Sequence, residues 1–201
     1  MSGHGARLLD MWETTEELSA LQDLLDSSHA GATDHLRGII SDDRTLRASE
    51  IAGQMTGMGV LSLATVTAKG EPRVSAMDGH FLHGCWTIST DPRSAKGRQI
   101  QARPAVSAAC VEGEEMAVFT HGQVEILTPE HPDRDEVLGY RSNFYGADAL
   151  LWEDVVLMRI RPTWMVGYAF KRDELLAARG VEPEVGPSDD LPGWSGQGCE
   201  L

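Results

Sequence analysis

The spacing of apolar residues changes from a helical to a strand-like period at about residue 58. Before that point, leucines recur every three or four residues along one helix face, at Leu18, Leu21 and Leu25. Thr14 and Glu17 stand ahead of them at the spacing of a capping box, which predicts a helix over 15–27. Shorter helices are predicted over 34–40 and 49–57. Helices of this kind are expected to pack as an extension on a core or on a partner.

After that point, β-branched and apolar residues recur in short runs separated by turn residues. The runs predict seven strands, over 59–66, 73–81, 85–90, 104–111, 116–127, 154–161 and 163–170. Asp78 and Gly79 suggest a bulge in the second strand, and residues 130–145 are predicted to form a helix. Because most of the strands follow one another through turns, the pattern favours an antiparallel barrel or sandwich over repeated βαβ units.

A basic segment follows the third predicted strand. Asp91 suits the N-cap and Pro92 the first position of a helix over 92–102. Four cations lie close together here, at Arg93, Lys96, Arg98 and Arg103. Hydroxyl donors stand beside them, at Ser89, Thr90 and Ser94. One interpretation is an anion site at the helix start, and the other is a solvated basic face that pairs with acidic neighbours.

Composition narrows the classes of partner and location. The chain has 201 residues and a formal net charge of −14, so neither nucleic acid nor an anionic membrane is an expected partner. No apolar run is long enough to span a bilayer, and the first residues lack the apolar stretch of a signal peptide, so a cytoplasmic location is expected. An odd number of cysteines argues against a disulfide framework: Cys85, Cys110 and Cys199.

Three segments in order resemble the pyridoxamine 5'-phosphate oxidase-like, FMN-binding split-barrel superfamily: ATVTAKGEPRVSAMDGHF, CWTISTDPRSAKGRQIQARPAVSAA and VFTHGQVEIL. The shared pattern is an A-T-V strand, a G-x-P turn, a strand ending in Thr and an S-x-K helix. The resemblance implies a mainly β (α+β) fold, an antiparallel split β-barrel with peripheral helices over 49–172. A helical extension over 1–48 would precede it, and a short helix with an acidic, Pro- and Gly-rich tail over 173–201 would follow.

The resemblance also implies a homodimer with the cofactor at the subunit interface. The second strand would lie along the flavin ring, through Arg73, Val74, Ser75, Ala76 and Met77. The end of the third strand and the next helix would hold the cofactor phosphate, through Ser89, Thr90, Ser94 and Lys96. His80 and Trp164 are further candidates for cofactor contact. FMN is the expected cofactor, with the deazaflavin coenzyme F-420 as the alternative and haem as a third possibility.

The chain departs from the members that oxidise pyridoxamine phosphate. Their Arg-x-V-L-L-K strand has Ser75 here at the Arg position and His80 at the Lys position. Their tryptophan- and arginine-rich end is replaced by acidic residues, so vitamin B6 oxidation is not expected. The prediction is an FMN- or deazaflavin-dependent oxidoreductase that acts on an unidentified small molecule. The alternative is a haem- or flavin-binding protein of the same fold without redox turnover.

Two histidines and a cysteine stand close together, at His80, His83 and Cys85. A turn separates the two histidines and no third ligand has the spacing of a metal site, so no metal is predicted. In a haem protein, His80, His83 or His121 could serve as the axial ligand. No catalytic acid or base is assigned from the sequence.

Overall fold

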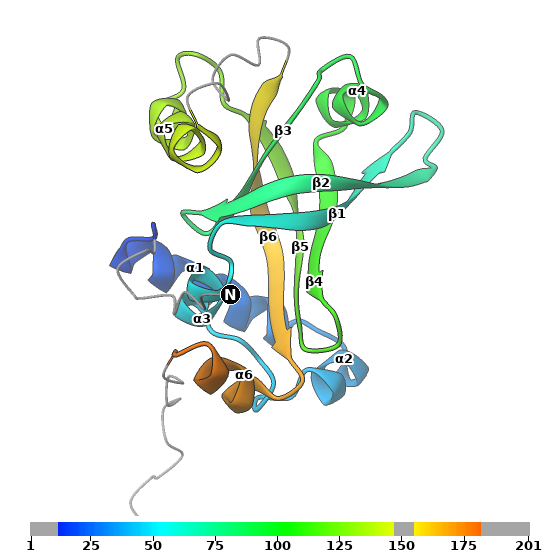
Figure 1. Ribbon diagram of the computed structural model, residues 1–201. Helices are drawn as coiled ribbons and strands as arrows, with labels where there is room; N and C mark the ends of the chain where they lie inside the picture. The colour runs from blue at the N-terminus through cyan, green and yellow to red at the C-terminus, as the bar shows by residue number, and fades with distance from the viewer. Residues whose placement is uncertain (1–11, 147–154, 182–201) are drawn as a thin grey trace, which may run out of the picture.

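The computed structural model describes residues 12–146 and 155–181. Within these ranges, six antiparallel strands close into a barrel in the order β1-β2-β3-β6-β5-β4, which confirms the predicted antiparallel barrel (Figure 1). The strands are β1 (Met58–Val66), β2 (Pro72–Leu82), β3 (Cys85–Thr90), β4 (Ala105–Glu112), β5 (Met116–Ile126) and β6 (Val156–Ala169). Cys199 and the acidic tail beyond residue 181 lie outside the described residues.

Strand residues alternate between the barrel interior and its outer surface. Leu61 and Leu63 on β1 are fully buried, whereas Val60, which precedes Leu61, is 59% exposed. Trp86 and Ile88 on β3 fill the same interior. Inward-pointing side chains of β2 and β3 pack in the core, so only the outward-pointing ones can contact a ligand on the barrel surface.

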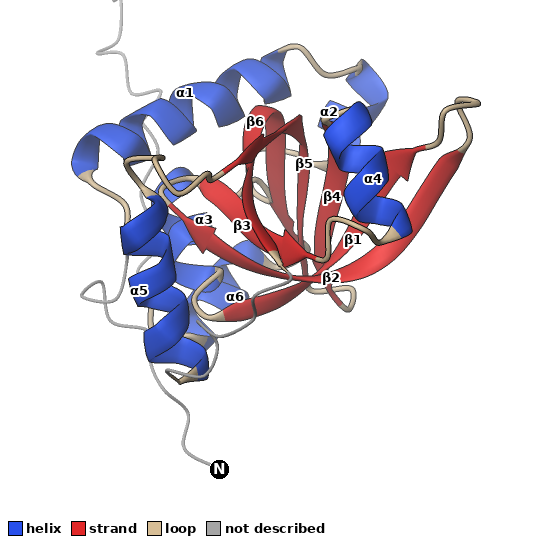
Figure 2. Cartoon of the chain, turned by 90° about the horizontal axis from the view of Figure 1, so that it is seen from above, coloured by secondary structure: helices blue, strands red, loops and turns tan. Residues whose placement is uncertain are grey.

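Six helices in the described ranges pack against the barrel. They are α1 (Thr15–Ala30), α2 (Asp34–Ile39), α3 (Ala48–Gln54), α4 (Ala95–Ala102), α5 (Arg134–Tyr145) and α6 (Arg172–Ala178). The capping box predicted at the start of α1 is confirmed, with Glu17 N donating to Thr14 Oγ1 and Thr14 N donating to Glu17 Oε2. At the end of β3, α4 lies on one side and α5 on the other (Figures 1 and 2). No helix in the described ranges has the length and apolar character needed to cross a membrane.

The prediction of two strands separated at Pro162 is wrong, because β6 runs through this residue without a break. Gly122 of β5 pairs with Pro162 and His121 pairs with Trp164, so Thr163 is an extra residue at a bulge. A proline has no N–H to give to the ladder, and a bulge is the place where a strand tolerates that loss.

The bulge predicted at Asp78 and Gly79 is also wrong. The pairing of β1 with β2 runs without a shift along both strands. Gly79 is required for packing instead, since a Cβ there would lie 2.5 Å from Cδ1 of Leu61 and 3.3 Å from Cε3 of Trp86. The glycine therefore admits core side chains and does not bend the strand.

Candidate cofactor site

The start of α4 is held in place by a short network of hydroxyl groups. Ser94 is the N-cap, and its Oγ accepts a hydrogen bond of 3.0 Å from the Gly97 amide. The prediction that Asp91 caps this helix is wrong; its carboxylate accepts from the Arg93 amide at 2.7 Å, in the loop before the helix. Thr90 at the end of β3 lies 3.3 Å from Ser94, oxygen to oxygen. Two of the predicted phosphate-site hydroxyls, Thr90 and Ser94, are therefore brought together.

The loop before α4 packs directly on the first turn of the helix. A Cβ at Gly97 would lie 2.4 Å from the carbonyl oxygen of Asp91 and 3.0 Å from Cα of Pro92. Only glycine fits this contact without moving backbone atoms. The close approach fixes where the amide groups of the first helical turn point, and free amides at a helix start favour an anion.

Lys96 joins α4 to the second strand. Its Nζ donates a hydrogen bond of 3.1 Å to the carbonyl oxygen of Ala76, twenty residues earlier in the chain. Ala76 belongs to the segment of β2 that the sequence assigns to the flavin ring. The predicted phosphate residues and the predicted ring residues thus meet at one place on the barrel surface.

The five predicted ring residues on β2 divide by face. Arg73, Val74 and Ala76 are exposed, and Ser75 is half-buried. Met77 is 4% exposed and belongs to the barrel core, so its side chain faces away from any ligand outside. The backbone of this segment and the outward side chains of Val74 and Ala76 are what a ligand on the outer surface could touch.

Ser89 contacts a residue that the sequence does not single out. Because side chains alternate along β3, Ser89 points toward α5, whereas Thr90 contacts Ser94 before α4. The Ser89 Oγ accepts a hydrogen bond of 2.9 Å from Nη2 of Arg141. Arg141 is 7% exposed, and burial lowers the pKa of its guanidinium. No motif marks this arginine, because its place depends on how α5 packs on β3.

His80 lies beneath α5, enclosed by aromatic side chains. Its Nε2 lies 2.8 Å from the hydroxyl of Tyr145, and its Nδ1 lies 3.2 Å from the hydroxyl of Tyr140. The side chain is 0% exposed. Burial, with the nearby charge of Arg141, lowers the pKa of His80 to about 4. The imidazole is therefore neutral at neutral pH, and both ring nitrogens face tyrosines.

His83 and Trp164 lie apart from these residues. The His83 Nδ1 lies 3.0 Å from Glu17 on α1, at the turn between β2 and β3. Trp164 stacks on His121 with ring centroids 4.6 Å apart. Strand register places Trp164 in one outward row with His121 and, across the barrel wall, with Val74. Trp164 therefore shares a face of the sheet with the β2 segment, four strands away.

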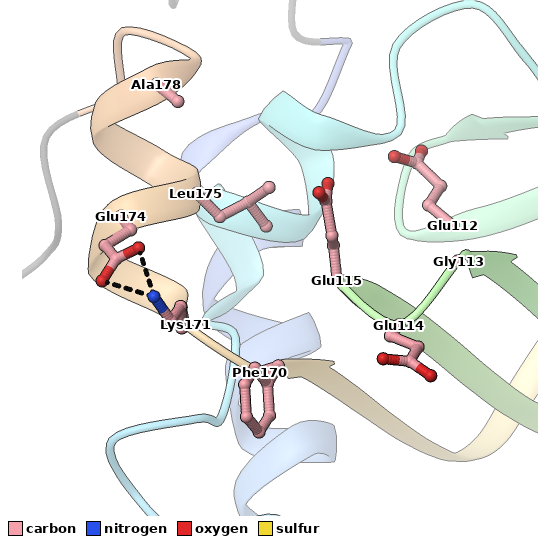
Figure 3. A pocket seen from close by; sticks show the side chains of 9 residues that line it. All are labelled: Glu112, Gly113, Glu114, Glu115, Phe170, Lys171, Glu174, Leu175 and Ala178. Carbon is pink, nitrogen blue, oxygen red and sulfur yellow. Dashed lines mark hydrogen bonds and ion pairs between the residues drawn. The ribbon is translucent and has the colours of Figure 1, made fainter.

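A cavity of about 740 Å³ lies at the opposite end of the barrel, between the β4–β5 turn and α6 (Figure 3). Four carboxylates line it, from Glu112, Glu114, Glu115 and Glu174. Lys171 is the cation among the lining residues, and its Nζ is already paired with Glu174 at 2.9 Å. This acidic cavity suits a phosphate poorly, so its size does not mark it as the cofactor site. Among the described residues, no cluster of His, Cys, Asp and Glu could hold a metal ion.

Comparison with known proteins gives a family and a fold. A family model described as pyridoxamine 5'-phosphate oxidase matches residues 49–167, more than half of the chain. The search of curated proteins found no match. Among solved structures, the conserved hypothetical protein Rv2991 from Mycobacterium tuberculosis has 20% identity and a TM-score of 0.56, over 73% of this chain and 96% of that one. This likeness shows the fold.

Two further solved structures are less similar. An F-420 reductase has 26% identity and a TM-score of 0.43, over 55% of this chain and 91% of that chain. A heme binding protein from Mycobacterium smegmatis has 20% identity and a TM-score of 0.46, over 64% of this chain and 57% of that chain.

Proposed function

The chain belongs to the pyridoxamine 5'-phosphate oxidase family, and on that premise we propose that it is an oxidoreductase that uses FMN, or a deazaflavin in its place, on a small molecule. The observation that carries the proposal is the hydrogen bond of 3.1 Å from Lys96 to the Ala76 carbonyl. It sets the cation of α4 directly beside the strand assigned to the ring. A phosphorylated flavin needs both features within the length of one molecule.

The residues around this contact suit the two ends of such a cofactor. Lys96 supplies a charged donor, the Thr90 and Ser94 hydroxyls supply neutral ones, and the start of α4 supplies amides. Among the described strands, β3 pairs with β2 only over residues 79–82, so the edge of β2 before them can offer backbone donors and acceptors to the polar edge of a ring. When bound, the flavin would supply the hydride chemistry, and the protein would supply position and charge.

The proposed active form is a homodimer that buries the outer face of β1, β2 and β4. Apart from Asp78 on β2, most residues of this face are small or apolar, and three of the largest are strongly exposed in the single chain: Val60, Val74 and Val111. A soluble protein seldom leaves such a surface open to water. A partner on this face would close the open side of a ring that lies along β2.

His80 enters the proposal as a positioning residue. Its side chain is sealed under Tyr140 and Tyr145, so it would act by holding α5 against β2. A haem site would require a different ligand. His121 is the exposed histidine of the outward row, with its Nδ1 2.8 Å from Ser107 and its ring stacked on Trp164.

Absorption spectroscopy combined with cofactor titration tests the proposal. The purified protein should bind FMN or coenzyme F-420 and show the corresponding flavin or deazaflavin spectrum. Lys96→Gln should weaken that binding by about 10- to 100-fold, the range for a charge-assisted hydrogen bond. Lys171→Gln removes the same charge at the far end of the barrel and should leave the affinity unchanged.

Two outcomes would contradict the proposal. One is a Soret band from haem, with no binding of either flavin. The other is flavin binding that Lys96→Gln leaves intact in a variant whose circular dichroism shows the wild-type fold.

A further inference from the structure

The guanidinium of Arg141 is buried but only partly satisfied. The Nη2 atom donates to Ser89 at 2.9 Å, and the Cζ atom lies over the ring of Tyr145, 5.4 Å from its centroid. Its Nη1 is buried and has no hydrogen-bond partner in the part of the chain that the structure describes. A charged donor in this state is unusual, because buried charges in proteins are normally paired.

Burial at this position works against the charge. Desolvation lowers the pKa of the Arg141 guanidinium, and the neighbouring tyrosines and Asp78 offset only part of that effect. An arginine keeps its proton even so, since its ordinary pKa lies far above neutrality. Arg141 therefore keeps its positive charge, and its Nη1 is a donor to which an anionic oxygen could bind.

Arg141 stands on the opposite side of the candidate cofactor site from Lys96. Asp78, the β2 residue that acts on Arg141 electrostatically, points to the same outer face as Ala76, two positions earlier. The Ala76 carbonyl is the acceptor of Lys96. The two cations therefore approach neighbouring positions of β2, one from α4 and one from α5, and these helices flank the end of β3 (Figures 1 and 2).

The carboxylate of Asp78 does not neutralise Arg141. Asp78 is exposed, and no hydrogen bond or ion pair joins these two described residues. Water screens an exposed carboxylate, so its attraction for the guanidinium is weak. A phosphate oxygen placed against Nη1 would make a direct and desolvated contact, which is much the stronger of the two.

We propose that Arg141 is a phosphate-binding residue, with Nη1 donating to a phosphate oxygen while Ser89 and Tyr145 fix the orientation of its guanidinium. The inference rests on the proposed function in that the phosphate belongs to the flavin cofactor or to a phosphorylated substrate beside it. A planar guanidinium held on one edge by Ser89 presents its other donor in a defined direction. Lys96 and Arg141 then bind anionic oxygens from two sides.

The test compares Arg141→Gln with Arg134→Gln, using FMN and riboflavin as ligands. Riboflavin lacks the phosphate, so the pair of ligands isolates that contact. Arg134 lies earlier on the same helix and donates to the carbonyl of Leu127, so the control removes the same charge from α5. Arg141→Gln should weaken FMN binding by about 10- to 100-fold and leave riboflavin binding unchanged. Arg134→Gln should change neither.

Inorganic phosphate distinguishes the two sources of the phosphate group. If Arg141→Gln binds FMN normally, the proposal requires that phosphate raise the melting temperature of FMN-loaded wild-type protein and not that of the variant. This result assigns Arg141 to a substrate phosphate. Should the wild-type protein bind neither flavin, the proposed function fails, and the same phosphate titration on the free protein still decides whether Arg141 binds the anion.

The stability of the ligand-free protein separates a binding role from a structural one. If Arg141 served only to stabilise the fold, its replacement should lower the melting temperature of the ligand-free protein. A buried donor kept for a ligand should leave the melting temperature unchanged or raise it in Arg141→Gln, because an uncompensated charge is removed. If Arg141→Gln does not fold, Arg141→Lys provides the comparison of FMN with riboflavin, because lysine keeps the buried charge but lacks the second donor that the guanidinium holds in a fixed direction. The proposal fails if Arg141→Gln weakens the binding of FMN and of riboflavin equally. It also fails if the variant keeps both wild-type FMN affinity and the rise in melting temperature that inorganic phosphate causes.

Discussion

The Nε2 atom of His80 on β2 and the hydroxyl of Tyr145 in the last turn of α5 lie 2.8 Å apart. Tyr140 approaches the other ring nitrogen at 3.2 Å, so the imidazole joins the strand to the helix at two points. This clamp holds α5 over β2 and β3, where Arg141 reaches Ser89. Its strength should depend on pH, because His80 must stay neutral to remain buried.

The stability that His80 contributes should fall as the pH falls from 6.5 to about 4. Burial, with the charge of Arg141, lowers the folded-state pKa of His80 to about 4, below its ordinary value of 6.5. The unfolded chain therefore takes up the proton first, and acid favours unfolding across this window. The stability advantage of wild type over His80→Gln should be complete above pH 6.5 and shrink toward pH 4, by at most about 3 kcal/mol. Urea denaturation across this range measures it; a constant advantage would contradict the argument.

His83, three residues later, should respond to pH in the opposite direction. Burial by itself lowers the pKa of His83, but the hydrogen bond and charge of Glu17, with Glu136 and Glu13, outweigh burial and raise the pKa. The stability from this contact should be fully present below pH 6.5 and be lost as the pH rises through the raised pKa.

The matched variant for this test is His83→Asn. His83 has a φ of +54°, a backbone conformation that asparagine tolerates better than most residues. Urea denaturation should show the advantage of wild type over this variant shrinking above pH 6.5. An advantage that grows with pH would mean that Glu17 does not govern the protonation of His83.

Local features of the fold could be predicted from the sequence because the residues that decide them are neighbours. The capping box of Thr14 and Glu17 needs only two side chains three positions apart. The sequence predicts that α4 begins at residue 92, ahead of its actual start at Ala95. Asp91 and Ser94 are both good cap residues, and the choice between them depends on Thr90 and on the packing of Gly97, which are tertiary contacts.

The sequence can propose residues for the candidate site only where the chain itself carries a pattern. The segment from Ser89 to Lys96 resembles a family motif, and the structure brings two of its residues, Thr90 and Ser94, within 3.3 Å of each other. No sequence pattern marks Arg141, because its contact with Ser89 depends on how α5 packs on β3. The predicted separation of two strands at Pro162 is wrong for the same reason: the bulge that accommodates this proline depends on the pairing of β6 with β5.

Gly122→Ala should destabilise the barrel, whereas Gly139→Ala should stabilise it. A Cβ at Gly122 would lie 2.2 Å from the carbonyl oxygen of Arg161 and 2.9 Å from its carbonyl carbon, so backbone atoms must move. Overpacking of this kind costs about 1–3 kcal/mol. Gly139 lies in the middle of α5 with nothing within 4 Å of its Cβ position, and alanine there should add about 0.5–1 kcal/mol.

Thermal unfolding of Gly122→Ala and Gly139→Ala measures both changes in stability, and each variant adds the same single methyl group. The prediction fails if the melting temperatures move in the same direction, because one added methyl group would then act alike at a crowded strand and at an open helix position.

The outer face of the barrel predicts a dimer, from a row of residues that crosses five strands. Strand register places Val74, Ala64, Ser107, His121 and Trp164 side by side in this row. Most are small or apolar, and Val74 is 71% exposed. A two-fold partner on this face would bring Trp164 of one chain toward the β2 segment of the other. The proposed cofactor site would then be complete only in the dimer.

Val74→Asp should therefore separate the subunits and weaken FMN binding together. A carboxylate buried at the centre of an interface lacks a partner, and its desolvation opposes association. Ile39→Asp provides the control, because Ile39 is also an exposed apolar residue, at 45%, but lies on α2 outside this row. Light scattering should give twice the 21.9 kDa chain mass for wild type and for Ile39→Asp, and the single-chain mass for Val74→Asp. If monomeric Val74→Asp binds FMN with wild-type affinity, the site lies within one subunit and the partner contributes nothing to it.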